Sequence, residues 1–187
     1  MLKDADIRAV LLRNLHEIYS DDEETAIINE LGIDHGATRI DVAVVNGILH
    51  GFEIKSEADT LERLPYQMQY YNRLFERMTI VIDQRYLDSV KKIVPSWWGI
   101  QVVKQKKDGI VLVNKRKGRR QTSQDKDLLL KLLWKEDLER FIDYLSYPKK
   151  LKLLRKKEIY NLILREVNIK TIRLFVYETL RRRSLQN

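Results

Sequence analysis

Two short alternating apolar runs, separated by a turn dipeptide at residues 46–47, occupy residues 39–55. β-Branched side chains dominate the first run and Asn-Gly is a strong hairpin signal, so the segment predicts two neighbouring antiparallel strands. Asp41 lies near the start of the first run, and Glu53 and Lys55 end the second. The predicted hairpin therefore carries two carboxylates and a lysine, a set suited to metal-assisted hydrolysis of phosphodiesters.

The turn can be closed in two registers. A two-residue loop would set Asp41 opposite Phe52 and place a charge beside an aromatic ring. A three-residue, bulged loop would pair Val45 with Leu49. Asp41 would then lie opposite Glu53, with charges on one strand face and apolar residues on the other. Because one buried face normally specifies strand register, we predict the bulged loop.

A third carboxylate follows from the preceding segment. Residues 25–33 are ambiguous by period, but their β-branched content favours a strand. A hairpin centred on residues 35–36 would bring Glu30 opposite Asp41. Carboxylates this close repel one another unless a cation lies among them, and oxygen ligands suit Mg²⁺ or Mn²⁺. The alternative is a solvated strand face with no ligand.

Three motifs in chain order carry a resemblance to a known superfamily. They are Ile40-Asp41, the Phe-Glu-Ile-Lys of residues 52–55, and Gln67 four residues before Tyr71. Together they resemble the PD-(D/E)xK nuclease superfamily and, more narrowly, the bacterial sce7726 family assigned to it. The resemblance covers residues 1–103 well and the remaining chain more loosely. Its supporting stretches are residues 47–56, 59–65 and 95–100.

The resemblance implies a metal site with Mg²⁺ or Mn²⁺ as the cofactor. Asp41 and Glu53 would be the metal ligands, aided by the Ile54 carbonyl. Glu30 would be an additional ligand or would contact a metal-bound water. Glu17, in the first predicted helix, competes with Glu30 for that role, and the periodicity leaves both open.

The resemblance also implies roles in catalysis. Lys55 would orient or activate the attacking water and offset charge in the transition state. Gln67 and Tyr71, one helical turn apart, would lie over the site. His50 is expected on the opposite strand face from Glu53, away from the chemistry. The implied activity is hydrolysis of phosphodiester bonds, with DNA as the expected substrate.

The remaining periodicities complete the predicted fold, a restriction-endonuclease-like α/β core with a mixed sheet. Helices are expected at residues 4–18, 64–76 and 86–94. Further strands are expected at residues 79–82, 99–103 and 110–113, with a turn at Asp108-Gly109. The absence of cysteine, of a long apolar run and of a secretory signal predicts a cytoplasmic protein without membrane contact.

The net charge of +8 is divided unevenly along the chain. Residues 1–100 carry a formal charge of −6, and residues 101–187 carry +14. We predict a nuclease-like core at 1–113, a basic linker at 114–126 and a basic, all-α domain at 127–187. The expected helices of that last domain span residues 128–145, 151–167 and 169–183.

A positively charged tail favours nucleic acid, most simply DNA, as the partner. Residues 135–145 and 155–167, separated by residues 147–150, loosely resemble a small helix-extended-helix DNA-binding module of the SAP type. A docking or dimerisation appendage, with a homodimer or another protein as partner, is the alternative. A nucleic-acid-binding accessory subunit and an oligomeric scaffold are the functions that compete with a nuclease. The expected phosphate contacts are Lys149, Lys150, Lys152, Arg155, Lys156, Lys157, Arg119 and Arg120.

Overall fold

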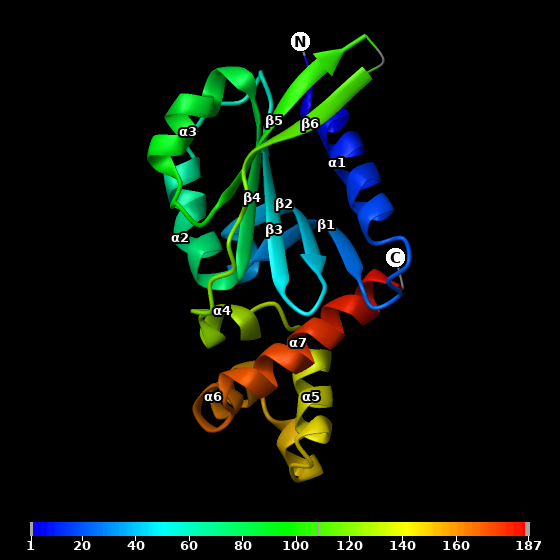
Figure 1. Ribbon diagram of the computed structural model, residues 1–187. Coiled ribbons are helices and arrows are strands. Elements are labelled where there is room, and N and C mark those ends of the chain that lie inside the picture. The colour runs from blue at the N-terminus through cyan, green and yellow to red at the C-terminus, as the bar shows by residue number, and fades with distance from the viewer. Residues whose placement is uncertain (1, 108, 186–187) are drawn as a thin grey trace.

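The computed structural model describes residues 2–107 and 109–185. These residues form a six-stranded sheet in the order β1-β2-β3-β4-β5-β6 (Figure 1). β3, β4 and β5 are parallel neighbours, and the other pairs are antiparallel, so the sheet is mixed as predicted. Asp108, expected to form a turn with Gly109, lies outside the described residues. The strands are β1 (Ala26–Ile33), β2 (Thr38–Val45), β3 (Leu49–Lys55), β4 (Arg77–Asp83), β5 (Gly99–Lys106) and β6 (Gly109–Arg116).

Helices cover both faces of the sheet (Figure 1). α1 (Asp4–Ile18) packs its apolar stripe on one face, and α2 (Leu64–Leu74) and α3 (Leu87–Ile93) lie on the other. The predicted class, an α/β core followed by C-terminal helices, is confirmed. Within the described ranges, none of the helices combines the length and apolar character needed to cross a lipid bilayer.

The strand register agrees with the bulged-loop prediction. Val45 pairs with Leu49, and the Asn46 amide donates to the Ile48 carbonyl at 3.0 Å. Gly47 has a φ of 61°, a left-handed conformation that glycine adopts without steric cost. The β1–β2 hairpin is centred on residues 35–36 as expected, through the 3-10 turn η1 (Asp34–Gly36).

The C-terminal helices differ from the prediction in two places. The helix expected at 151–167 begins only at Lys156, because residues 149–153 form a 3-10 turn. The expected helix at 128–145 is two helices, α4 (Lys126–Leu130) and α5 (Lys135–Tyr144). The Asp137 side chain accepts a hydrogen bond from the Trp134 amide at 2.9 Å and so starts a new helix inside the apolar run. The last elements are the 3-10 turn η3 (Lys149–Leu153), α6 (Lys156–Glu166) and α7 (Ile169–Ser184).

The segment between the sheet and the helices is bound to the core along its length. β6 continues to Arg116, three residues past the expected boundary of the core. The Arg119 amide then donates to the Trp97 carbonyl, and the Gln121 amide donates to the Glu76 carbonyl, both at 2.8 Å. One buried apolar cluster extends from the sheet into α4, α5, α6 and α7. The helices therefore share a hydrophobic interior with the sheet.

Candidate active site

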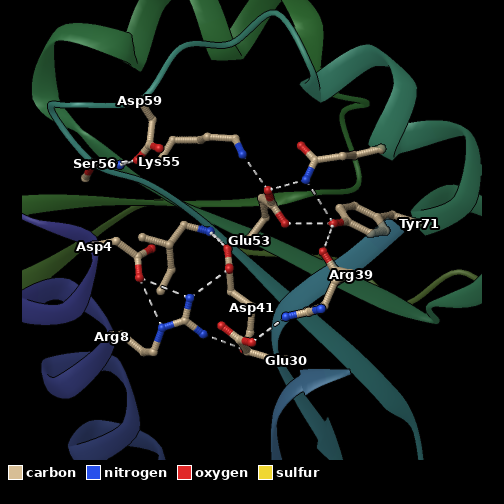
Figure 2. Close-up of polar contacts among 12 residues, drawn as sticks. Asp4, Arg8, Glu30, Arg39, Asp41, Glu53, Lys55, Ser56, Asp59 and Tyr71 are labelled. Atoms are coloured by element: carbon tan, nitrogen blue, oxygen red, sulfur yellow. Dashed lines mark hydrogen bonds and ion pairs between the residues drawn. The ribbon is translucent and has the colours of Figure 1, made fainter. Parts of the chain in front are cut away.

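Glu53 on β3 is the centre of the site (Figure 2). Its side chain is buried, with 1% of the residue exposed. Lys55 Nζ lies 2.6 Å and Gln67 Nε2 lies 2.8 Å from Glu53 Oε1. The Tyr71 hydroxyl lies 2.8 Å from Oε2. α2 presents Gln67 and Tyr71 on one side because they are four residues apart, so the structure brings together these four predicted residues.

Asp41 lies just past the last paired residues of β2 and β3. Its Oδ2 accepts a hydrogen bond from the Ile54 amide at 2.7 Å, in place of a regular strand contact. Arg8 on α1 donates to Asp41 Oδ1 at 2.9 Å and to the Asp41 carbonyl at 2.8 Å. Arg8 also pairs with Asp4, one helical turn earlier, at 3.0 Å. An arginine from the first helix therefore holds β2 where it separates from β3.

Asp41 and Glu53 line the same cavity of about 400 Å³. The figure shows the two carboxylates next to each other between α1 and α2 (Figure 2). Lys55, Gln67 and Ile54 line the cavity as well. The remaining polar or charged side chains around it are Asp4, Thr38, Arg39, Asp59 and Arg63.

Burial raises the pKa of both carboxyl groups. For Glu53, desolvation is the largest cause and Asp41 adds to it, whereas Lys55 and Tyr71 oppose it. For Asp41, desolvation outweighs the hydrogen bond from Ile54 and the charge of Arg8. Burial and the nearby Glu53 also raise the pKa of Tyr71, so its phenol stays a hydrogen-bond donor. Burial therefore disfavours the ionised form of both carboxyl groups in spite of their cationic partners, and an added cation would oppose this effect.

This donor set fits Mg²⁺. Mg²⁺ commonly binds one or two protein carboxylates and keeps waters or substrate phosphates at its other positions. Asp41 and Glu53 would hold the ion here, and Ile54 lines the same cavity. Across residues 2–107 and 109–185, however, no three His, Cys, Asp or Glu side chains form a metal-binding group. The expected set of three carboxylates is therefore not formed.

The prediction for Glu30 is wrong. Counted along the hairpin, Glu30 would lie opposite Asp41. Its backbone φ of 53°, however, interrupts the regular strand pairing at this position. Its carboxylate instead forms an exposed ion pair with Arg39 at 2.6 Å. Glu17, the competing candidate, is exposed on α1 and is not part of the cavity wall. The acidic residue that α1 contributes to the cavity wall is Asp4, which was not predicted from the sequence. The available signal was its spacing of four residues from Arg8, with which it forms an ion pair.

The predicted phosphate-binding residues of the C-terminal helices lie in two consecutive elements. Three lie in η3, two lie in the first turn of α6, and Arg155 directly precedes that helix. Lys149 and Lys150 are exposed, whereas Lys152 pairs with Asp143 at 2.7 Å. The cluster, which we call the η3–α6 basic cluster, consists of Lys149, Lys150, Lys152, Arg155, Lys156 and Lys157.

Arg119 and Arg120 are engaged in internal contacts. Arg120 pairs with the buried carboxylate of Glu76 at 2.5 Å. Arg119 donates to the Ser96 hydroxyl at 3.1 Å. Both residues fix the segment after β6 to the core. Arg120 could bind a phosphate only by giving up its ion pair with the buried carboxylate of Glu76.

The fold and this site define an α/β protein whose mixed sheet carries a buried carboxylate, a partly buried carboxylate and a lysine. The chain belongs to the Bacteriophage P4 protein cII family, whose sequence profile matches residues 1–187. It is 30% identical over 145 residues to protein cII of Enterobacteria phage P4, covering 76% of this chain and 54% of that protein. The chain thus spans about half the length of this relative. Among solved structures, the SPO1766 protein of unknown function from Silicibacter pomeroyi matches with a TM-score of 0.47 and 17% identity, over 78% of this chain and 92% of that one.

Proposed function

We propose that this protein is a metal-dependent nuclease that hydrolyses phosphodiester bonds, with DNA as its substrate. One observation carries the proposal. Glu53 and Lys55, on one side of one strand, line a single cavity with Asp41 from the neighbouring strand. The motif resemblance to the PD-(D/E)xK superfamily and its sce7726 family supports the same activity. We also propose a cytoplasmic location, in keeping with a chain that has no cysteine.

The residues of the cavity have distinct tasks in this proposal. Asp41 and Glu53 would hold a Mg²⁺ or Mn²⁺ ion, which would stabilise charge on a phosphoryl oxygen and lower the pKa of a water. The Lys55 ammonium group donates hydrogen bonds. A phosphate oxygen or the attacking water can accept one of these bonds in place of the Glu53 carboxylate. Gln67 and Tyr71 hold Glu53 in one rotamer through its two oxygens.

Substrate binding would use the positive charge of the C-terminal half. The η3–α6 basic cluster offers exposed side chains for phosphates, and such contacts position a strand without reading its sequence. Arg63, at the start of α2, adds a cation to the wall of the cavity itself. The acidic cavity and the basic helices would then contact one polyanion at two places.

The test is cleavage of plasmid, single-stranded DNA and RNA, each with Mg²⁺, Mn²⁺ or EDTA. Wild type should cleave DNA only with a metal. Lys55→Met should lose about 100-fold in rate, the typical effect of removing one transition-state donor. Lys104→Met, which removes an exposed lysine on β5, should cleave like wild type. Equal rates for wild type and Lys55→Met would refute the proposal.

A second function is favoured by one specific observation. Each carboxylate already has a cationic partner on this chain, because Arg8 pairs with Asp41 and Lys55 pairs with Glu53. A nucleic-acid-binding accessory subunit needs only this self-neutralised arrangement and the basic helices. DNA binding with a steep salt dependence, without cleavage under any metal condition, would favour this second function.

A further inference from the structure

A second cavity, of about 550 Å³, lies on the other side of the sheet from Glu53. His50 and Phe52, which alternate with Glu53 along β3, form part of its floor, and α1 forms one wall. Its volume is in the range of small-molecule sites. It is lined by Leu11, Asn14, Leu15, Ile18, Tyr19, His50, Phe52, Arg77, Thr79, Gln101, Leu112, Asn114, Arg116, Lys117 and Gly118.

All charged side chains in the wall of this cavity are positive. Arg77, Arg116 and Lys117 contribute three cations, and no acidic residue belongs to the wall. Arg116 donates to the carbonyls of Pro95 and Trp98, so its guanidinium is already partly used. An excess of positive charge in a partly enclosed space favours an anion.

Arg77 is the cation of this wall with a buried, unpaired donor. It is half-buried, and its Nε is a buried atom that no hydrogen-bond partner contacts in the described residues. A buried guanidinium nitrogen is costly unless an acceptor pairs with it. Planar guanidinium groups bind phosphate or carboxylate oxygens through two parallel hydrogen bonds.

A neutral acceptor in the same wall also lacks a donor. Gln101 uses its amide nitrogen on Asn114 at 3.0 Å, while its Oε1 is buried without a partner. His50 Nε2 lies 2.9 Å from the Thr79 hydroxyl. Burial and the charge of Arg77 lower the pKa of His50 to about 3, so its ring is neutral. The buried polar atoms of the wall without a partner among the described residues are thus a guanidinium nitrogen and an amide oxygen, which suit an anion that also carries a donor.

Most of the remaining wall is apolar. Leu11, Leu15 and Leu112 face the space, and the ring of Phe52 lies beside that of His50 with centroids 4.1 Å apart. A planar ring in the ligand would gain contact area against these groups. We propose that this cavity binds a nucleoside monophosphate, with its phosphate on Arg77 and a hydroxyl or amino donor on Gln101. The site is independent of the Asp41–Glu53 cavity and of any metal.

The test is calorimetric titration of the full chain, in EDTA, with 5′-AMP, inorganic phosphate and adenosine. 5′-AMP should bind, and both fragments should bind at least about tenfold more weakly, because each keeps only part of the contacts. Binding of phosphate as tight as that of 5′-AMP would show a simple anion site and overturn the nucleotide assignment. Absence of 5′-AMP binding would overturn the proposal altogether.

Variants locate the bound ligand. Arg77→Met keeps most of the side-chain volume and should weaken 5′-AMP binding at least about tenfold, the loss expected for a charge-assisted contact. Lys104→Met is the charge-matched control, and Lys55→Met reports on the other cavity; both should bind like wild type. If Arg77→Met does not fold, Gln101→Leu should show the weakened binding. Loss of binding in Lys55→Met with unchanged binding in Arg77→Met or Gln101→Leu would overturn the assignment.

Discussion

Lys55 Nζ lies 2.6 Å from Glu53 Oε1, and both side chains leave the same side of one strand. Two residues of separation put them there, because side chains alternate along a strand. Gln67 approaches the same oxygen from α2. The pair is therefore held by the strand that carries it and by a helix that packs over it.

The buried carboxylates make stability depend on pH. Burial raises the pKa of Glu53 above its ordinary value of 4.5. A carboxyl with a higher pKa in the folded chain contributes stability below its unfolded pKa, and this contribution is lost as pH rises through the folded pKa. Glu53→Gln should therefore gain stability relative to wild type as pH rises above 4.5. Urea unfolding in EDTA across a pH series measures this; exposed Glu62→Gln is the control, and a constant difference would contradict the prediction.

A divalent cation should reverse that loss. If Mg²⁺ binds the folded chain at Asp41 and Glu53, it should raise the melting temperature in a concentration-dependent way. At 100 times the dissociation constant, the gain is about 2.7 kcal/mol for one site. Asp41→Asn should lose most of the shift, whereas Asp88→Asn, on α3, should keep it. A shift of equal size in Asp41→Asn would place the ion elsewhere.

Arg8 should stabilise the fold through β2. Its side chain is 18% exposed and donates to both the carbonyl and the carboxylate of Asp41. Arg8→Met should lower the free energy of unfolding by about 1–3 kcal/mol, the range for hydrogen bonds to charged groups. Arg13→Met, on the exposed side of the same helix, is the matched control. Chemical unfolding of the two variants decides; similar values would show that the Arg8 contacts contribute little.

The helical part should unfold together with the sheet. The Tyr177 hydroxyl on α7 donates to buried Glu76 Oε2 at 2.6 Å, and Gln124 donates to the same hydroxyl at 2.9 Å. Tyr177→Phe should cost about 1–2 kcal/mol in a single unfolding transition, because it leaves buried groups unpaired. Tyr144→Phe, whose ring is half exposed, should cost little. Two separate transitions in wild type would contradict this coupling.

The η3–α6 basic cluster should set the salt dependence of DNA binding. Lys149→Gln with Lys150→Gln should weaken binding by similar factors on unrelated sequences and lower the salt slope by about 1–2. The double variant Lys104→Gln with Lys106→Gln removes the same charge from exposed positions on β5. Fluorescence anisotropy over a range of salt concentrations provides the comparison. An equal slope change in both double variants would mean that only net charge matters.

Local patterns were sufficient to predict much of the site. The alternation of residues 39–55 predicted the pairing of Val45 with Leu49, which the structure confirms. The four-residue spacing of Gln67 and Tyr71 predicted a shared helix side, and both side chains do contact Glu53. These relationships depend on neighbours along the chain or across one turn, where strand and helix periods apply directly.

Other relationships depended on elements far apart in the sequence. Arg8 reaches Asp41 only because α1 packs against the sheet, and Arg120 pairs with Glu76 only because the fold buries that carboxylate beside it. Glu30 lies at the expected position along the hairpin, but its backbone is left-handed there and its side chain pairs with Arg39.

The sequence by itself therefore determined the α/β class, the hairpin register and the set of three side chains, Lys55, Gln67 and Tyr71, that contact Glu53. Only the tertiary structure decided that Arg8 pairs with Asp41, that Glu30 is excluded from the Asp41–Glu53 cavity, and where the second, positively charged cavity lies. The reason is physical. Periodicity is a property of neighbouring residues, whereas charge compensation and cavity shape depend on which distant elements pack together and exclude water.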